Sequence, residues 1–465
     1  MTSFRQFDVV VIGAGPAGTA AALRAGDLGA KTALITRDAF GGMAANDGPI
    51  PVRVLAHAAR LARDARQLAQ YGISVEQPAL DYTRLVQRAR DVVGEARSHS
   101  TLLEQVKNAG VELVEHAGTV EFADAHTICS ASGPTLRGTR IVICSGGVSR
   151  TLGVPGAELT VTPADAFSLA AVPKSMIVIG AGATGAQVAS IFNALGSSVT
   201  ICQAGPRIIE SEDAEISDAV AAAFREDGIA IHQGFGAIER IDAGANGAAV
   251  TLAGAPRQPL KAELVVCAIG WRAGIDALKL ERAGVKTNAH GFIEVDELLR
   301  TSAPHVYAAG DVIGRSMLVP PAVRDGFIAG NNAAASQPMT VRADLEPIGS
   351  FTDPEYAKVG LTEERARARY DAVVSRAAYA ETTRPIIDGR TRGFCKVVID
   401  RNTRKLLGCH IVGERAVEVA QMAAIAMTGG MTVDTIARVP LSFPTYANVF
   451  GRAALRAVRL LGGYS

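Results

Sequence analysis

Two continuous apolar runs, at residues 7 to 12 (FDVVVI) and 176 to 179 (MIVI), organise the first half of the chain. A run without alternating polar positions predicts a parallel strand that is buried on both faces. Each run is followed by an alanine-rich helical pattern and by a second short strand, at residues 31 to 35 and 198 to 203. This alternation of strand and helix predicts an α/β fold with parallel sheets.

The C-terminal part follows a different pattern. From about Asp344, strand-like segments at residues 393 to 399 and 405 to 412 precede helical patterns at residues 416 to 427 and 433 to 437. Strands that are followed by helices, instead of alternating with them, set this part of the chain apart from the first half. At roughly 150 residues per domain, the 465 residues of the chain predict about three domains.

Both strand-to-helix turns carry the glycine pattern G-x-G-x-x-G. The first glycine makes a tight turn, the second lets the backbone approach a pyrophosphate, and the third lets the helix pack closely on the strand. The first glycine and the residue that ends the next strand are 23 positions apart in both copies. This internal repeat predicts two dinucleotide sites. Its glycines are Gly13, Gly15 and Gly18 in the first copy and Gly180, Gly182 and Gly185 in the second.

The residue at the end of the second strand is normally acidic in such units, because it binds the ribose hydroxyls. Here Thr36 and Gln203 occupy these two positions, and neither side chain carries a charge. Arg207, four residues after Gln203, is a candidate partner for a 2′-phosphate, with a solvated surface charge as the alternative. The choice between NADH and NADPH stays open, as does the question whether Asp38 compensates for Thr36.

Further motifs lie between and after the two copies. Apolar runs at residues 139 to 147 and 264 to 270 both end in glycine. Residues 301 to 311 (TSAPHVYAAGD) resemble a known cofactor-binding motif, and that resemblance implies a buried strand that delivers the carboxylate of Asp311 to hydroxyl groups of the cofactor. Prolines 320 and 321 suit the first turn of a helix whose N-terminus faces that site. The candidate cofactor-binding residues of these segments are Ser145, Gly146, Gly270, Asp311 and Val319.

These motifs, in this order, resemble the pyridine nucleotide-disulfide oxidoreductase family over essentially the whole chain. The resemblance implies two Rossmann-like domains, which bind FAD and NAD(P)H, and a C-terminal α+β dimerisation domain. It also implies a homodimer in which the partner's C-terminal domain completes each active site. The implied FAD-binding domain comprises residues 1 to 150 and 273 to 342, the NAD(P)-binding domain residues 151 to 272, and the interface domain residues 343 to 465.

Two segments depart from that family. Residues 41 to 53 (GGMAANDGPIPVR) keep the frame of the redox-active loop, but Ala44 and Pro49 occupy its two cysteine positions. Near the C-terminus, Phe443 and Asn448 replace the family's His-Glu pair. A disulfide exchanger needs two thiols, and a phenyl ring cannot transfer protons as imidazole does near neutral pH. The sequence therefore predicts that disulfide reduction has been lost.

A third departure concerns the charge pair beside the flavin. The resemblance implies a lysine of the redox helix paired with a glutamate of the second nucleotide unit, where this chain has Arg53 and Gln187. Arginine keeps the positive charge, whereas glutamine carries none. We expect the cation to favour the electron-rich reduced flavin, with Asp47 as an alternative counter-ion. The predicted cofactor contacts of this loop are Gly41, Gly42, Met43 and Arg53.

Hydride transfer from a nicotinamide to a flavin needs positioning and the cofactor's own chemistry, not a protein nucleophile. The electrons then leave across the face where the thiols would lie. Its expected walls are Met43, Ala44, Pro49 and, from the partner subunit, Phe443 and Tyr446. Such a lining favours flat hydrophobic acceptors, so the prediction is an NAD(P)H:acceptor oxidoreductase with a quinone as acceptor. If these residues plug the cavity, oxygen or a second nicotinamide becomes the acceptor.

Two other functions compete with this prediction. Residues 413 to 416 (GERA) and 441 to 456 resemble the soluble pyridine nucleotide transhydrogenase branch, although that branch keeps one loop cysteine and the Lys-Glu pair. A non-catalytic FAD-binding redox sensor or scaffold is the other alternative, because Thr36, Gln187 and Gln203 have lost expected charges.

Composition adds several exclusions. The 47 Lys and Arg residues balance 46 Asp and Glu residues, so no net charge points to nucleic acid. The six cysteines show no C-x-x-C and no metal-ligand spacing, and several lie in apolar runs as small buried hydrophobes. Residues 1 to 6 are too short and polar for a signal peptide, and no 18-residue apolar stretch occurs. We expect a reduced, cytoplasmic protein that binds no metal.

Overall fold

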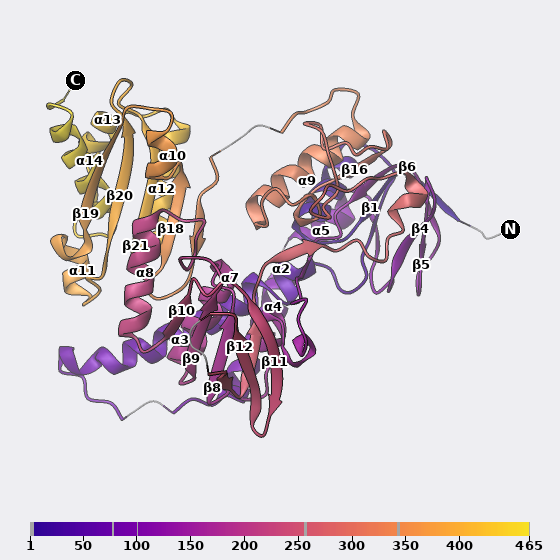
Figure 1. Cartoon of the computed structure of the whole chain (residues 1–465). Helices are drawn as coiled ribbons and strands as arrows, with labels where there is room; N and C mark the ends of the chain where they lie inside the picture. The colour runs from indigo at the N-terminus through magenta and orange to yellow at the C-terminus, as the bar shows by residue number, and fades with distance from the viewer. Residues whose placement is uncertain (1–3, 77–78, 100, 255–257, 342–344, 465) are drawn as a thin grey trace. The chain divides into compact units, whose positions relative to one another are not determined.

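The computed structural model describes residues 4–76, 79–99, 101–254, 258–341 and 345–464 (Figure 1). The chain divides into two compact units. The first comprises Met1–Leu55, Thr83–Arg150 and Gly270–Ala343, and the second comprises Ala56–Tyr82, Thr151–Ile269 and Asp344–Ser465.

A mostly parallel sheet forms the centre of the first unit. The strands of this unit are β1 (Arg5–Ile12), β2 (Thr32–Ile35), β3 (Glu112–Val114), β4 (Val120–Asp124), β5 (Thr127–Ser130), β6 (Leu136–Ile143), β7 (Gly147–Ser149), β15 (Trp271–Ala273) and β16 (Val306–Ala308). The sheet has the order β3-β2-β1-β6-β5-β4, and β16 also pairs with β6. Strands β4 and β5 are antiparallel additions at one side, while β7 and β15 form a separate antiparallel ladder.

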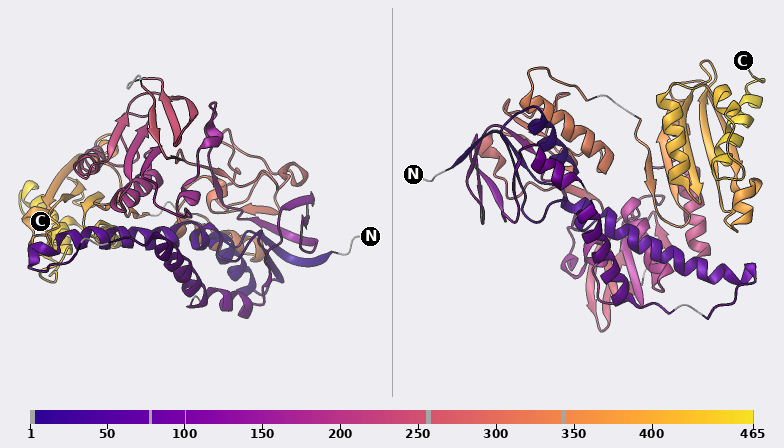
Figure 2. Two further views of the ribbon diagram at one scale, coloured as in Figure 1. Left: turned by 90° about the horizontal axis from the view of Figure 1, so that it is seen from below. Right: turned by 180° about the vertical axis from the view of Figure 1, so that it is seen from behind.

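Two helices of the first unit, α1 and α9, pack against each other and against this sheet (Figures 1 and 2). A Cβ at Gly326 or Gly330 of α9 would collide with the carbonyl oxygens of Ala17 and Ala21 of α1, so the two backbones touch along a glycine-alanine seam. The helices of this unit are α1 (Pro16–Asp27), α2 (Gly42–Asn46), α4 (Tyr82–His99), α5 (Leu102–Asn108), α9 (Val319–Ala334) and the 3-10 turns η3 (Leu280–Ala283) and η4 (Asp311–Ile313). Helix α3 (Pro49–Gln67) begins here and continues beyond Leu55.

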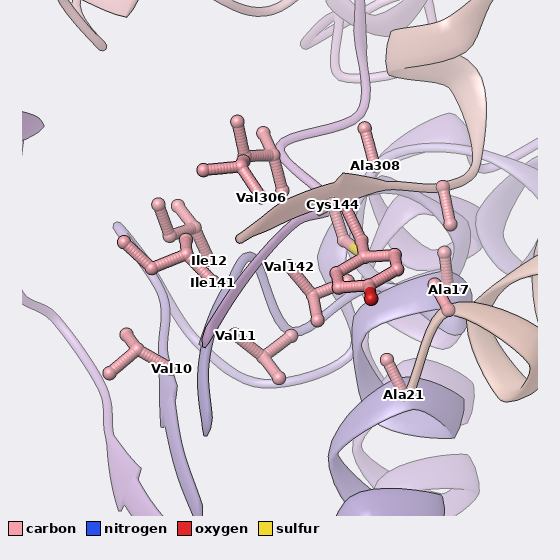
Figure 3. Close-up of a cluster of buried hydrophobic side chains, with 14 of the residues drawn as sticks. Val10, Val11, Ile12, Ala17, Ala21, Ile141, Val142, Cys144, Val306 and Ala308 are labelled. Atoms are coloured by element: carbon pink, nitrogen blue, oxygen red, sulfur yellow. The ribbon is translucent and has the colours of Figure 1, made fainter. Parts of the chain in front are cut away.

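The core of the first unit lies between the sheet and these helices (Figure 3). It consists of β-branched side chains from the central strands and of small side chains from α1. Its labelled members are Val10, Val11, Ile12, Ala17, Ala21, Ile141, Val142, Cys144, Val306 and Ala308. Because the central strands are covered on both faces, they carry the continuous apolar runs that the sequence shows.

Strand register brings four strand ends to one edge of this sheet. Ile12 pairs with Ile35 and with Ile143, and Ile143 pairs with Ala308. The turns that follow β1, β2, β6 and β16 therefore meet at the carboxyl edge, where open α/β sheets bind their ligands.

The second unit contains a parallel sheet in the order β10-β9-β8-β14. Ile179 pairs with Cys202 and with Cys267, so three strand ends meet at the carboxyl edge here as well. An antiparallel sheet of β11, β12 and β13 accompanies it. The elements of this part are η1 (Leu68–Tyr71), η2 (Ala157–Leu159), α6 (Pro163–Ala166), β8 (Ser175–Ile179), α7 (Ala183–Ala194), β9 (Ser198–Gln203), α8 (Ala214–Glu226), β10 (Ala230–Gln233), β11 (Ile238–Gly244), β12 (Gly247–Leu252), β13 (Leu260–Ala262) and β14 (Leu264–Cys267).

The C-terminal part of the second unit is an antiparallel sheet in the order β17-β18-β21-β20-β19 with helices against it. Its elements are β17 (Ile348–Ser350), β18 (Tyr356–Gly360), α10 (Glu363–Arg367), β19 (Ala372–Ala378), η5 (Tyr379–Glu381), α11 (Thr383–Ile387), β20 (Gly393–Asp400), β21 (Leu406–Gly413), α12 (Ala416–Thr428), α13 (Val433–Arg438) and α14 (Ala447–Leu460). Lys396 of β20 is 1% exposed and pairs with Asp213 (2.8 Å) and Glu363 (2.6 Å), which ties the start of α8 to this sheet.

The predicted strand and helix types are confirmed, while several boundaries differ. The runs at residues 139 to 147 and 264 to 270 stop as strands at Ile143 and Cys267, because Gly146 and Gly270 turn the chain with φ of 75° and 107°. Within residues 301 to 311, only Val306–Ala308 is a strand. No helix in the described parts of the chain combines the length and the apolar character that a membrane span needs.

Candidate functional site

The first glycine loop, after β1, is packed so tightly that Gly13 and Gly18 have no space for a side chain. Gly13 has a φ of 101°, and its N–H donates to the carbonyl of Ile35 (2.7 Å). A Cβ at Gly13 would overlap the carbonyl oxygen of Cys144, and a Cβ at Gly18 would overlap that of Gly13. Helix α1 begins after Gly15 with Pro16 in its first turn and no side-chain cap, so its first amides are open to an anionic ligand.

The loop at residues 41 and 42 packs directly on this turn. The N–H of Gly41 donates to the carbonyl of Ala14 (2.9 Å), and a Cβ at Gly42 would stand 2.7 Å from the Cα of Gly15. Both glycines have positive φ, at 104° and 57°. The glycine loop after β1 and the loop at residues 41 and 42 are therefore in direct contact.

Thr36 directly follows β2 and is buried. Its N–H donates to Val114 (2.9 Å), and its carbonyl accepts from Ala117 (3.1 Å). The carboxylate of Asp38 pairs with the exposed Arg37 (2.7 Å). The position at the end of β2 therefore has no charged side chain, and the nearby carboxylate of Asp38 is paired with Arg37.

The segments that follow the apolar runs at residues 139 to 147 and 264 to 270 lie side by side through the ladder of β7 and β15. Gly274 donates its N–H to the carbonyl of Gly146 (2.9 Å), and Arg150 donates its N–H to that of Gly270 (2.9 Å). The hydroxyl of Ser145 is buried and has no hydrogen-bond partner among the described residues. An unpartnered buried hydroxyl indicates a group that a ligand completes.

Asp311 follows β16 at the same sheet edge and opens η4, after Gly310 with a φ of 81°. Burial raises the pKa of the Asp311 carboxyl, and no ion pair to it occurs among the described residues. A Cβ at Gly147 would lie 3.7 Å from Asp311 Oδ2, so the carboxylate stands within van der Waals distance of the start of β7.

Helix α9 begins at Val319 after Leu318, without a side-chain cap. Pro320 and Pro321 have no N–H, so Val319 supplies the sole backbone donor among the first three helical residues. The N-terminal dipole and this donor are available to a ligand.

These features fit FAD. The glycine cradle suits a pyrophosphate, the Asp311 carboxylate suits the ribityl hydroxyls, and the Ser145 hydroxyl lacks the partner that a bound group would supply. The residues that would hold it are Gly13, Gly15, Gly18, Thr36, Gly41, Gly42, Ser145, Gly146, Asp311 and Val319.

The half-buried carboxylate of Asp311 is expected to destabilise the cofactor-free protein. Because burial raises the folded-state pKa of Asp311, the folded state binds the proton more tightly than the unfolded state, and stability falls as pH rises through that range. Asp311→Asn is therefore expected to raise the urea midpoint of the FAD-free protein at pH 7, and the gain should disappear below the unfolded carboxyl pKa of about 3.9. An unchanged or lower midpoint at pH 7 would contradict this prediction.

The segment at residues 43 to 53 carries no thiol. Met43 and Ala44 lie half-buried on α2, Pro49 starts α3 and is exposed, and Arg53 follows on α3 with its Nη1 buried. The side chain of Asn46 accepts a hydrogen bond from Arg97 of α4, which fixes this loop within its unit.

The second glycine loop repeats the first. Gly180 has a φ of 92°, donates its N–H to Cys202 (2.8 Å) and would place a Cβ 2.5 Å from the carbonyl oxygen of Ala268. A Cβ at Gly185 would overlap the carbonyl oxygen of Gly180, whereas Gly182 faces open space. The predicted repeat is confirmed, and the open loop fits a second pyrophosphate.

Gln203, at the end of β9, forms a hydrogen bond with the second glycine loop. Gln203 Oε1 accepts the N–H of Ala181 (2.9 Å). Arg207 is half-buried, and its Nε has no hydrogen-bond partner among the described residues. On α7, Gln187 Nε2 donates to the carbonyl of Ala183 (3.2 Å), one turn earlier.

The C-terminal residues predicted to face the flavin, Phe443 and Tyr446, lie in the turn just before α14. Phe443 is 75% exposed and, with Asn448, lines a groove of about 480 Å³. The Tyr446 hydroxyl donates to Asp388 (2.8 Å), and the ring lies 6.0 Å from that of Tyr379. Asn448 Oδ1 accepts the N–H of Thr445 (2.8 Å).

The cysteines offer no substitute for the missing pair. Five of the six are buried, and Cys129 is half-buried. Burial raises the pKa of Cys144 and of Cys202 to about 12, which disfavours the reactive thiolate. Cys395 and Cys409 have their sulfur atoms 3.8 Å apart, both inside the C-terminal sheet. No cluster of metal-ligating side chains occurs in the described sequence.

Comparison with known proteins identifies the family. Residues 7–326 match the family model described as pyridine nucleotide-disulphide oxidoreductase, and residues 347–454 match its dimerisation domain. The chain belongs to the pyridine nucleotide-disulphide oxidoreductase family. The resemblance predicted from the motifs is confirmed, and so are the fold class and the cofactors FAD and NAD(P)H. Membership makes this protein an FAD-dependent NAD(P)H oxidoreductase, and the dimerisation domain indicates a homodimer.

Relatives of several activities match over almost the whole chain. Dihydrolipoyl dehydrogenase of Chlorobaculum tepidum is 33% identical over 98% of each chain. A soluble pyridine nucleotide transhydrogenase of Mycobacterium tuberculosis is 32% identical over 97% of each chain. The solved structure of the HOCl-induced flavoprotein disulfide reductase RclA of Escherichia coli matches with a TM-score of 0.85 and 25% identity, covering 96% of this chain and 99% of that one.

Proposed function

We propose that this oxidoreductase passes electrons from NAD(P)H through FAD to a non-thiol acceptor, with a quinone as the acceptor class. The observation that carries this proposal is the occupation of both redox-cysteine positions by Ala44 and Pro49. The remaining cysteines are buried or half-buried. Electron relay through a dithiol requires a pair of cysteines, which these positions lack, whereas electron transfer directly from a flavin requires no thiol.

The chain's own residues contribute binding, positioning and charge. When bound, FAD supplies the ring that accepts and releases the electrons. The two glycine loops hold the pyrophosphates of the flavin and the nicotinamide nucleotide, and Asp311 accepts hydrogen bonds from cofactor hydroxyls. Arg53 keeps a positive charge on the helix that leaves the former redox loop, which favours an electron-rich ring. Gln187, bonded within its helix, contributes no opposing charge.

The lining of the acceptor face supports a flat, apolar substrate. Met43, Ala44 and Pro49 replace a thiol-bearing loop by apolar groups. We propose that Phe443 and Tyr446 of each chain complete the partner's site, and the high exposure of Phe443 in the single chain supports this assignment. An aromatic and apolar wall binds quinone rings better than charged thiols.

A soluble transhydrogenase is the second candidate function. It is favoured by the 32% identity to such an enzyme over 97% of this chain. A second nicotinamide nucleotide would then be the acceptor, and no quinone would be needed.

An anaerobic half-reaction tests the proposal. NADH or NADPH should bleach the flavin absorbance of the oxidised protein, and p-benzoquinone should then restore it faster than NAD⁺, NADP⁺ or lipoamide at the same concentration. Faster reoxidation by a pyridine nucleotide would support the transhydrogenase, and reoxidation by lipoamide would contradict the thiol-free mechanism. A flavin that neither nucleotide reduces would leave a non-catalytic role.

Alkylation of cysteines should not inhibit the protein. Iodoacetamide reacts with thiolates, and burial with raised pKa keeps Cys144 and Cys202 protonated. We expect quinone reduction to stay within about twofold of its initial rate, since no thiol takes part. The half-buried Cys129 is the most accessible thiol, so Cys129→Ser provides the matched control. A loss of most of the activity in both proteins would refute the mechanism.

A further inference from the structure

The turn after β9 brings an unexpected carboxylate to the second glycine loop. Ala181, inside the loop, donates its N–H to Gln203 Oε1 (2.9 Å) and accepts the N–H of Ile209 at its carbonyl (2.7 Å). Ile209 has a φ of 39°, which β-branched residues rarely adopt, so these contacts hold the turn in a shape that the residue alone disfavours. Glu210 follows directly and is exposed.

Glu210 and Gln203 flank the same point beyond the end of β9. A Cβ at Gly205 would stand 2.6 Å from Glu210 Oε2 and 3.1 Å from Gln203 Nε2. Because Gln203 Oε1 is used by Ala181, its NH₂ group is the one that faces Gly205 and the carboxylate. In this fold the adenosine ribose of a bound dinucleotide lies next to the strand-end residue, so both side chains border the position of its 2′ substituent.

We propose that Glu210 makes this protein select NADH over NADPH. A carboxylate accepts hydrogen bonds from the ribose hydroxyls of NADH and repels a 2′-phosphate, which carries nearly two negative charges. Arg207 of the same turn is the competing cation, but it is half-buried with an enclosed Nε, whereas Glu210 is exposed beside Gly205. The acidic function that Gln203 lacks is thus supplied from seven residues further along the chain. This inference deepens the proposed function and rests on nicotinamide binding at the second glycine loop.

Calorimetric titration of the oxidised FAD-bound protein with NAD⁺ and NADP⁺ tests the inference without turnover. We expect wild-type protein to bind NAD⁺ at least about 10-fold more tightly, the size of one charged contact. Glu210→Gln should reduce this ratio to about threefold or less, and Glu210→Arg should reverse it by supplying a phosphate partner. Glu239→Gln, an exposed change of the same charge on β11, should leave the ratio unaltered. Flavin content, measured by absorbance, verifies that each variant is folded.

Tighter binding of NADP⁺ by the wild type would overturn the inference, as would an unchanged ratio in both Glu210 variants. The role of Glu210 and the proposed quinone acceptor can be refuted independently of each other. A protein that reduces quinone but prefers NADP⁺ refutes the role of Glu210 alone. A protein that prefers NAD⁺ through Glu210 but does not reduce quinone refutes the acceptor alone.

Discussion

Replacing Asp311 with alanine is expected to weaken FAD binding by about 10- to 150-fold, which corresponds to the roughly 1.5–3 kcal/mol of a lost charged hydrogen bond. Asp311 stands at the carboxyl edge where β1, β6 and β16 end, and its half-buried carboxylate has no ion pair among the described residues. We therefore expect its favourable interactions to come from the bound cofactor. The variant should be purified with less flavin, and reconstitution of the FAD-free protein should give the dissociation constant by flavin fluorescence.

A surface aspartate of the same unit provides the matched control. Asp91 lies on α4 and accepts a hydrogen bond from Gln87 (2.8 Å), so Asp91→Ala removes a carboxylate without touching the site. Its flavin content should equal that of the wild type. Equal FAD affinity of the Asp311→Ala variant and the wild type would show that the carboxylate does not contact the cofactor.

Gly185→Ala is expected to slow flavin reduction by NADH and NADPH by at least about 100-fold, since the loss of two charged hydrogen bonds of roughly 1.5 kcal/mol each already gives this factor. The added Cβ would overlap the carbonyl oxygen of Gly180, so the loop that cradles the pyrophosphate must open. FAD should stay bound, because the clash lies in the second unit. Stopped-flow bleaching of the flavin measures the effect.

The same substitution can be made in the glycine loop of the first unit. Gly18→Ala introduces the same clash with Gly13 in the first unit and should deplete the protein of FAD. Gly94 of α4 has no atom near its potential Cβ, so Gly94→Ala adds a methyl group without strain and should change neither property. Normal nicotinamide reduction by the Gly185→Ala variant would mean that the nucleotide does not bind at the second loop.

The fold was predictable where burial dictates the residue types. Strands β1 and β8 are covered on both faces, and therefore their sequences are continuous apolar runs. The glycine loops were predictable because Gly13 and Gly180 occupy positions that admit no side chain. Strand ends at the crossovers were less predictable, because a glycine permits a positive φ without requiring one.

Contacts between distant residues left no trace in the sequence. Tyr446 was predicted as a wall of the acceptor face, which stays a prediction, whereas the hydrogen bond of its hydroxyl to Asp388, 58 residues away, was not predicted. The place of Glu210 beside Gln203 depends on a turn in which Ile209 has a positive φ, and isoleucine disfavours that conformation. Local preference therefore pointed away from the geometry that tertiary contacts impose.

The seam between α1 and α9 has a consequence for how this protein can diversify. Any side chain larger than hydrogen at Gly326 or Gly330 would push the two helices apart, and with them the starts of both helices at the flavin site. Direct backbone contact along the seam therefore fixes the position of one helix start relative to the other. We expect substitutions at Ala44 and Pro49 to alter the proposed acceptor face while leaving that helix contact in place.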